Sequence, residues 1–141
     1  MNTQFDIAFI RSKKPCYNPA IYLPEGWKGS VKGILRHREI PASDKLWVVL
    51  RKDLLNDKPL RLFAVACARR ALARIKNPDP RSLKACDVAE SFANGIATRE
   101  ELTLARDDAY AATAAATATA AYTAERKWQV KYLLTMLEDK K

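Results

Sequence analysis

The chain has no long hydrophobic run, few glycines and a single histidine, and these absences argue against several classes of function. No apolar stretch approaches the ~18–20 residues that a bilayer-spanning helix requires, so we expect no membrane association. Its 4 glycines do not form a glycine-rich phosphate loop after a strand. The first residues lack a positive segment followed by a long apolar one, so we expect no secretory signal.

Cysteine and histidine are too few to indicate a disulfide framework or a metal site. The 3 cysteines, Cys16, Cys67 and Cys86, are odd in number and lie far apart. They predict small core residues in a reducing compartment, and hence a cytoplasmic protein. The single histidine, His37, lies between two arginines, without the nearby cysteines or carboxylates that would complete a metal site.

Catalytic signatures are also missing. The adjacent pairs Glu100-Glu101 and Asp107-Asp108 fall on a predicted helix. Neighbouring side chains on a helix point about 100° apart, which is poor geometry for paired catalytic carboxylates. We therefore expect no enzymatic activity, no cofactor and no metal, and an enzyme with an unrecognised site is left as a third alternative.

What the chain does contain is typical of a small helical protein. Its 141 residues, 48% hydrophobic and 29% charged, suit one soluble globular domain. The pattern predicts an all-α single domain over 1–141, a bundle of five or six helices with a long alanine-rich C-terminal helix. Residues 1–40 are expected to form a less regular basic segment, and residues 41–141 the helical core.

The clearest helical signals lie in the middle of the chain. Apolar residues recur at i, i+3 and i+4 over 59–75, which predicts an amphipathic helix. Asp79 and Pro80 predict the cap and first residue of the next helix, and Gly95 predicts its end. We expect the core to form from the 59–75 stripe, the helix after Pro80 and the long C-terminal helix.

That long helix has a distinct start and an unusual middle. Thr98 and Glu101 have the spacing of a capping box, and the helix is expected to continue to about Leu137. Residues 109–124 are uncharged and alanine-rich, and alanine is the strongest helix former. The small side chains leave open which face of this stretch packs.

The remaining segments give weaker predictions. Residues 5–11 are apolar and could form either a strand or one to two helical turns. Prolines predict an extended connection over 14–24. A helix is plausible over 27–38 despite two glycines, and another is expected over 45–55, capped by residues 41–44.

Positive charge is concentrated in the first half of the chain. Residues 1–76 hold 16 Lys/Arg and 6 Asp/Glu, whereas residues 77–141 hold 9 and 10, for a total net charge of +9. This asymmetry favours a surface for an acidic partner, either a protein or a nucleic acid. A polar face that contacts only water and binds no partner would show the same excess of positive charge.

Two groups of cations are the candidate binding residues for an anionic partner. On a helix over 27–38, Lys28, Lys32 and Arg36 would share one stripe because they are spaced four residues apart. The candidate site consists of Trp27, Lys28, Lys32, Arg36, Arg38, Arg61, Arg69, Arg70 and Arg74. Trp27 could stack on a base, and the last four arginines would lie on the solvent side of the 59–75 helix.

The order of motifs over about 41–125 resembles a known group of proteins. The segments 60–72, 79–82, 87–95 and 97–102, followed by an alanine tract, resemble alanine-rich helical proteins encoded by phages and bacteria. The chain is more loosely similar to immunity proteins of bacterial toxin systems, although it lacks the histidines often found in their alanine helix. The resemblance implies an all-helical, non-enzymatic protein, with no catalytic residues to transfer.

These observations support two main functional hypotheses. The first is a non-enzymatic protein-binding module, a phage-encoded or immunity-type inhibitor of a nuclease or defence effector, that docks on an acidic protein surface. The second is a sequence-nonspecific nucleic-acid-binding protein, although no helix-turn-helix, zinc-finger or RNA-recognition signature is present. The oligomeric state is left open.

Overall fold

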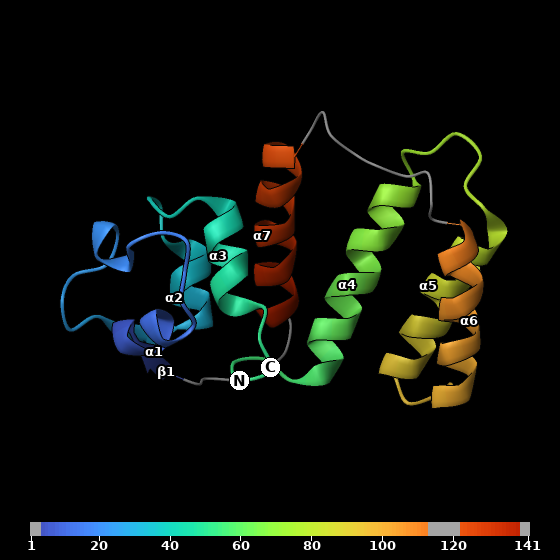
Figure 1. The fold of residues 1–141 in the computed structure, drawn as a ribbon, viewed down its shortest axis with the longest axis horizontal. Coiled ribbons are helices and arrows are strands. Elements are labelled where there is room, and N and C mark those ends of the chain that lie inside the picture. Colours follow the sequence, from blue (N-terminus) through green and yellow to red (C-terminus); the bar gives the residue numbers. More distant parts are fainter. Residues whose placement is uncertain (1–3, 113–121, 139–141) are drawn as a thin grey trace. The chain divides into compact units, whose positions relative to one another are not determined.

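The fold is mainly helical, as the sequence predicts. A computed structural model describes residues 4–112 and 122–138. Over these ranges it contains seven α-helices, one short 3-10 helix and a two-stranded sheet (Figure 1). The chain divides into two compact units: unit 1 comprises residues 1–56 and 123–141, and unit 2 comprises residues 57–122. The single bundle stays a prediction.

Unit 1 combines a small antiparallel sheet with short helices. Its elements are β1 (Gln4–Asp6), α1 (Ile7–Ser12), the 3-10 helix η1 (Pro19–Ile21), β2 (Lys28–Ser30), α2 (Val31–Arg36), α3 (Ala42–Val49) and nearly all of α7 (Tyr122–Glu138). Both alternatives for residues 5–11 occur, a strand and then a helix. Asp6 makes the switch, because its carboxylate accepts a hydrogen bond from the Phe9 amide and caps α1.

The helix expected over 27–38 is wrong at its start. Residues 28–30 form β2, which pairs with β1 so that Gly29 lies opposite Phe5. The helix α2 begins only at Val31, because the Ser30 hydroxyl accepts a hydrogen bond from the Gly33 amide at 3.2 Å. Lys28 is therefore on a strand and cannot share a helical stripe with Lys32.

The two neighbouring expectations also need correction. Residues 14–24 are not wholly extended, because they include η1, which Asn18 caps. The helix expected over 45–55 is α3, which ends at Val49. Leu54 and Leu55 are adjacent and both almost fully buried. On a helix their side chains would point about 100° apart, whereas the turn in which they lie lets both point into the core.

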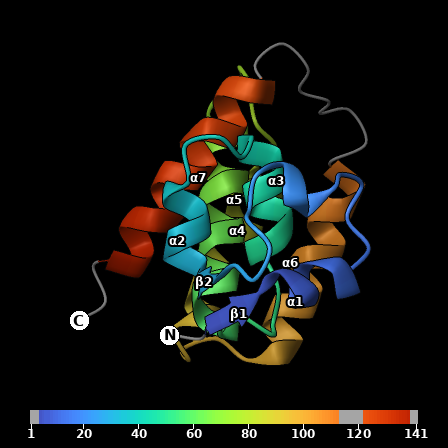
Figure 2. The same ribbon diagram turned by 90° about the vertical axis from the view of Figure 1, so that its left-hand side faces the viewer.

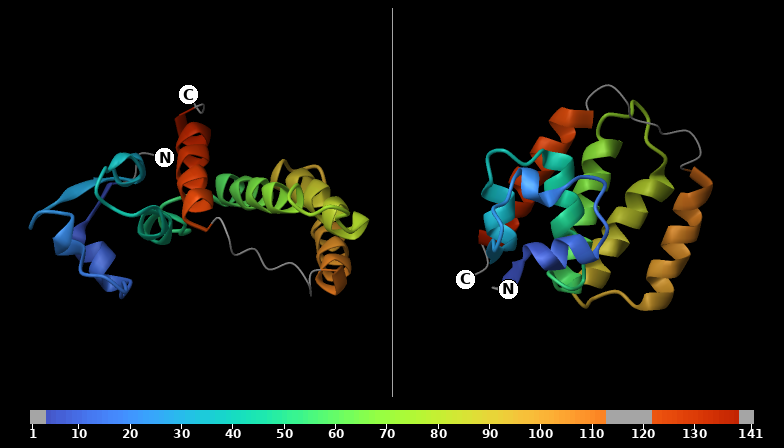
Figure 3. Two further views of the ribbon diagram at one scale, coloured as in Figure 1. Left: turned by 90° about the horizontal axis from the view of Figure 1, so that it is seen from above. Right: turned by 60° about the vertical axis from the view of Figure 1, so that its left-hand side comes forward.

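Unit 2 consists of three consecutive helices. They are α4 (Asp57–Leu72), α5 (Pro80–Ala93) and α6 (Arg99–Ala112), with α5 between the other two (Figure 3). The local start and stop signals are confirmed. Asp79 caps α5 through the Arg81 amide, Gly95 follows α5 with a positive φ of 78°, and Thr98 and Glu101 exchange two hydrogen bonds of 3.1 Å.

The apolar core is only partly where the sequence predicts it: Phe63 of the 59–75 stripe and Leu133 of the C-terminal segment are buried, but most of the core lies in residues 5–55. The largest fully buried side chains among the described residues all lie in unit 1: Ile10, Ile34, Val48, Val49, Leu54 and Leu133. Along α4, Phe63 and Val65 are buried, whereas Ala64, Ala68 and Ala71 are exposed. Alanine offers little apolar area, so the larger side chains decide which face of a helix is buried.

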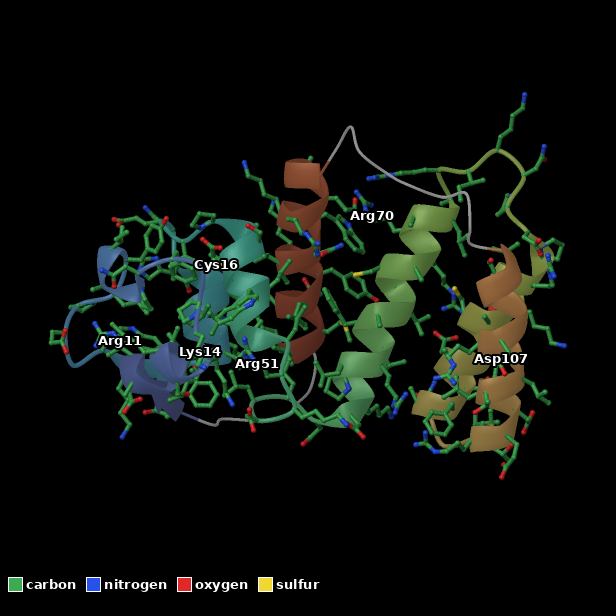
Figure 4. All side chains as sticks on the ribbon, in the orientation of Figure 1. Arg11, Lys14, Cys16, Arg51, Arg70 and Asp107 are labelled. Carbon is green, nitrogen blue, oxygen red and sulfur yellow. The ribbon has the colours of Figure 1, made fainter. Side chains whose placement is uncertain are left out.

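The three cysteines were expected to be core residues, and they differ in burial. Cys86 is buried and Cys67 partly buried, but Cys16, on the loop after α1 (Figure 4), is exposed, so the prediction that it is a core residue is wrong.

Residues 113–121, most of the alanine run, lie outside the described residues. One helix continuing to about residue 137 therefore stays a prediction, although α7 does include Leu137.

Candidate functional site

Nine residues were predicted to bind an anionic partner, and they fall into two separate units. Five lie in unit 1, on or beside β2 and α2, and four lie in unit 2, on or just after α4. Each group is therefore described by itself. The four predicted cations of unit 1 are called the α2 group: Lys28, Lys32, Arg36 and Arg38.

Trp27 packs inward instead of presenting its ring to a ligand. Its indole meets the Phe5 ring edge-on, with centroids 5.4 Å apart and an interplanar angle of 68°. It also lies over Gly29, where an added Cβ would be only 2.5 Å from the indole carbon Cζ2. Edge-to-face packing of this kind stabilises the sheet and occupies the ring.

The α2 group differs in how far each cation is already engaged. Lys28 is exposed and lies opposite Asp6 in the sheet register. Lys32 and Arg36 lie one turn apart on α2, and Arg38 is exposed two residues beyond the helix. Arg36 forms an ion pair with Glu138 of α7, which makes it the one member of the α2 group with a carboxylate partner among the described residues.

The backbone that carries the α2 group is held by α3. The Lys45 ammonium donates a hydrogen bond of 3.1 Å to the Leu35 carbonyl, near the end of α2. A cation at this position stabilises the helix C-terminus, whose carbonyl groups lack partners within the helix. Partial burial lowers the pKa of Lys45. Val31, Ile34 and Leu35 are buried beneath, so α2 presents its polar side outward.

In unit 2, two of the four arginines stabilise the packing of α4 on α5. The Arg69 guanidinium donates hydrogen bonds to Asp87 at 2.8 Å and to Glu90 at 2.9 Å, and these bonds raise its pKa. Arg61 lies over the Phe92 ring, 4.8 Å from its centroid. An arginine that already holds two carboxylates has few donors left for a partner.

The other two arginines continue along the same helix. Arg70 is partly buried on α4 and is labelled in Figure 4, and Arg74 is exposed just after the helix ends. Each has an interaction within the chain. The α4 arginines are thus mainly engaged in packing, and the α2 group is the better candidate for a binding surface.

Sequence reasoning missed two further exposed cations of unit 1. Lys127 and Lys131 are exposed on α7, four residues apart. The i, i+4 rule that selected Lys32 and Arg36 would have found this pair. No local pattern, however, indicates that α7 lies against α2, a contact between residues 102 positions apart.

Residues 4–112 and 122–138 contain neither a metal-binding cluster nor a membrane-spanning helix. In these ranges no group of three or more histidine, cysteine or carboxylate side chains is arranged to hold a metal ion. Nor is any helix there both long enough and apolar enough to span a bilayer. The expectation of a metal-free protein stays a prediction.

Comparisons with protein families, with curated proteins and with solved structures find no match to this chain. The resemblance to alanine-rich phage and bacterial proteins and to immunity proteins is therefore a prediction from the quoted motifs. Any function must be argued from the residues and their geometry.

Proposed function

We propose that this chain is a non-enzymatic binding module that docks on an acidic protein through the α2 group. Three of its cations, Lys28, Lys32 and Arg38, carry the proposal because α2 is held by buried side chains and by Lys45, and β2 by its pairing with β1. Because the backbone that carries these cations is already ordered, binding needs to order only their side chains, which favours affinity.

The distribution of charge supports unit 1 as the docking unit. Unit 1 holds 15 Lys/Arg and 8 Asp/Glu, a net charge of +7, whereas unit 2 holds 10 and 8, a net charge of +2. A local positive potential steers an acidic surface toward the binding site and raises the association rate.

The aromatic rings favour a protein partner over a nucleic acid. Proteins that bind single strands usually offer exposed aromatic faces on which bases stack. Trp27 packs on Phe5, and the rings of Trp128 and Tyr132 stack on each other with centroids 4.9 Å apart. Each of these three rings already contacts another ring of the chain, so the α2 group offers mainly charge, which suits carboxylates on a protein surface.

Within this class, we propose an inhibitor of the immunity type, encoded by a phage or a bacterium, whose target is a nuclease or defence effector. The motif resemblance supports this part of the proposal. The cations would cover an acidic region of the effector, such as the carboxylates that surround many nuclease sites. The inhibitor itself performs no chemistry.

The test uses purified proteins encoded by the genes that flank the one for this chain. Each is titrated with the wild-type chain, with the Lys32→Glu/Arg38→Glu double variant and with a control, Lys52→Glu/Lys58→Glu, which changes the net charge equally. Lys52 and Lys58 are exposed and lie outside the α2 group. We expect one acidic protein to bind, the α2 variant to weaken binding at least about tenfold, and the control to retain most of it.

A 20-base-pair duplex DNA is titrated in parallel. Tight duplex binding that falls steeply with salt, together with no binding to any flanking protein, would establish the nucleic-acid alternative and overturn the proposal. Equal losses for the α2 variant and the control would show a response to net charge alone.

A further inference from the structure

The helix α7 presents a second row of cations on the side away from its buried residues. Val130, Leu133 and Leu137 are buried, whereas Lys127 and Lys131 are exposed. Residues four and seven apart lie on the same face of a helix, so Lys127, Lys131 and Glu138 form one stripe. The stripe ends in a carboxylate.

That carboxylate joins the stripe to the α2 group. Glu138 forms the ion pair with Arg36, and α2 lies beside the C-terminal part of α7 (Figure 2). The side chains of Arg36 and Glu138 are 56% and 43% exposed, so the pair is open to solvent. An exposed ion pair contributes little to stability, and a competing carboxylate can therefore replace Glu138 at small cost.

We propose that the docking surface spans both helices, with Lys127 and Lys131 as further contacts, and that Glu138 occupies Arg36 until a carboxylate of the partner takes its place. This inference rests on the proposed function. On each helix the cations are four residues apart, about 6 Å along the axis. The occupant is an acidic protein surface whose carboxylates repeat at a similar spacing, such as a helix with glutamate at every fourth position.

Because Glu138 already pairs with Arg36, it competes with the carboxylates of the partner for that arginine. Removing its charge frees Arg36 and also removes repulsion of the incoming carboxylates. Glu25 offers a matched control, because it is an exposed carboxylate of unit 1 that pairs with a different arginine, Arg11, at 3.6 Å. Both substitutions raise the net charge by one.

The experiment measures binding of a fluorescein-labelled helical peptide with glutamate at every fourth position, by anisotropy at low salt. We expect Glu138→Gln to bind the peptide about threefold more tightly than wild type, and Glu25→Gln to stay within about twofold. We expect Lys127→Glu/Lys131→Glu to bind at least about tenfold more weakly, while Lys52→Glu/Lys58→Glu changes binding much less. Circular dichroism checks that each variant is folded.

Failure of this inference and failure of the proposed function give different results. If Lys32→Glu/Arg38→Glu loses the peptide while the α7 and Glu138 variants bind as wild type does, the proposed function stands and the two-helix surface is wrong. If wild type does not bind the peptide, or binds its glutamine counterpart equally well, the inference is overturned; the proposed function is overturned as well if no acidic flanking protein binds the chain.

Discussion

Gly29 lies in β2 where the Trp27 indole crosses the strand, and no larger residue fits there. A Cβ at this position would be 2.5 Å from the indole, whereas a Cβ at Gly33 would meet only the Ser30 hydroxyl oxygen, at 3.7 Å. The two glycines, four residues apart, therefore have different roles. Gly29 permits a close contact, and Gly33 is an ordinary helical position.

We predict opposite effects for alanine at these two positions. Gly29→Ala should lower the free energy of unfolding by about 1–3 kcal/mol, because the indole must leave its place against Phe5. Gly33→Ala should raise it by about 0.5–1 kcal/mol, because alanine restricts the unfolded chain and favours the helix. Urea denaturation of both variants measures the difference. Equal effects would mean that the indole does not restrict position 29.

Tyr17 is a residue whose ionisation should report on the fold. Burial, followed by the nearby charge of Asp44 and by Tyr22, raises its pKa to about 12. A phenol that holds its proton more tightly when folded contributes full stability below its unfolded pKa, about 10. That contribution is lost as the pH rises toward 12.

We predict that the tyrosine absorbance titration of the folded protein contains a transition near pH 12, and that Tyr17→Phe removes it. Between about pH 10 and pH 11, the stability of wild type should fall more steeply with pH than that of Tyr17→Phe. A Tyr17 transition at the ordinary phenol pKa would contradict the burial of its hydroxyl.

Among the elements, α6 begins with the best-defined local signal in the chain. We predict that Thr98→Ala lowers the free energy of unfolding by about 1 kcal/mol, because the Glu101 amide loses the hydroxyl that caps it. Thr103→Ala is the control, since Thr103 is exposed within the same helix and alanine is the better helix former there. Thermal unfolding measures both. A loss at position 103 as large as at position 98 would exclude a specific capping role.

Element boundaries were predictable where neighbouring residues determine them. Asp79 with Pro80, Gly95, and Thr98 with Glu101 act through hydrogen bonds and backbone conformations within a few residues. The start of α2 was not predictable in this way, because β2 exists only through its pairing with β1 more than twenty residues earlier. Helical periodicity over 27–38 could not reveal that pairing.

At the scale of the whole molecule, the candidate site was predictable only in part. The concentration of cations near the start of the chain is visible in the sequence, and the α2 group lies there. The sequence did not reveal that Trp27 packs inward or that Arg69 holds two carboxylates, because both depend on contacts with distant residues. The periodic alanines of α4 predicted a buried face, but alanine favours a helix whether it is buried or exposed, so their spacing does not show which face is in the core.

The division of charge between the units predicts where an acidic partner docks. Unit 1 has a net charge of +7 and unit 2 of +2, and the α4 arginines of unit 2 are mainly engaged in packing. Binding should therefore perturb unit 1 alone. Added salt should weaken it, because exposed charges are screened over about 8 Å at physiological ionic strength.

The most direct measurement is a nitrogen-15 NMR titration of the full chain with the acidic helical peptide. We expect the amide signals of residues 28–38 and of the exposed face of α7 to shift, while the signals of α4 and α5 stay unchanged. The shifts should be lost at high salt. Shifts centred on α4 and α5, or no shifts in unit 1 at low salt, would contradict this expectation.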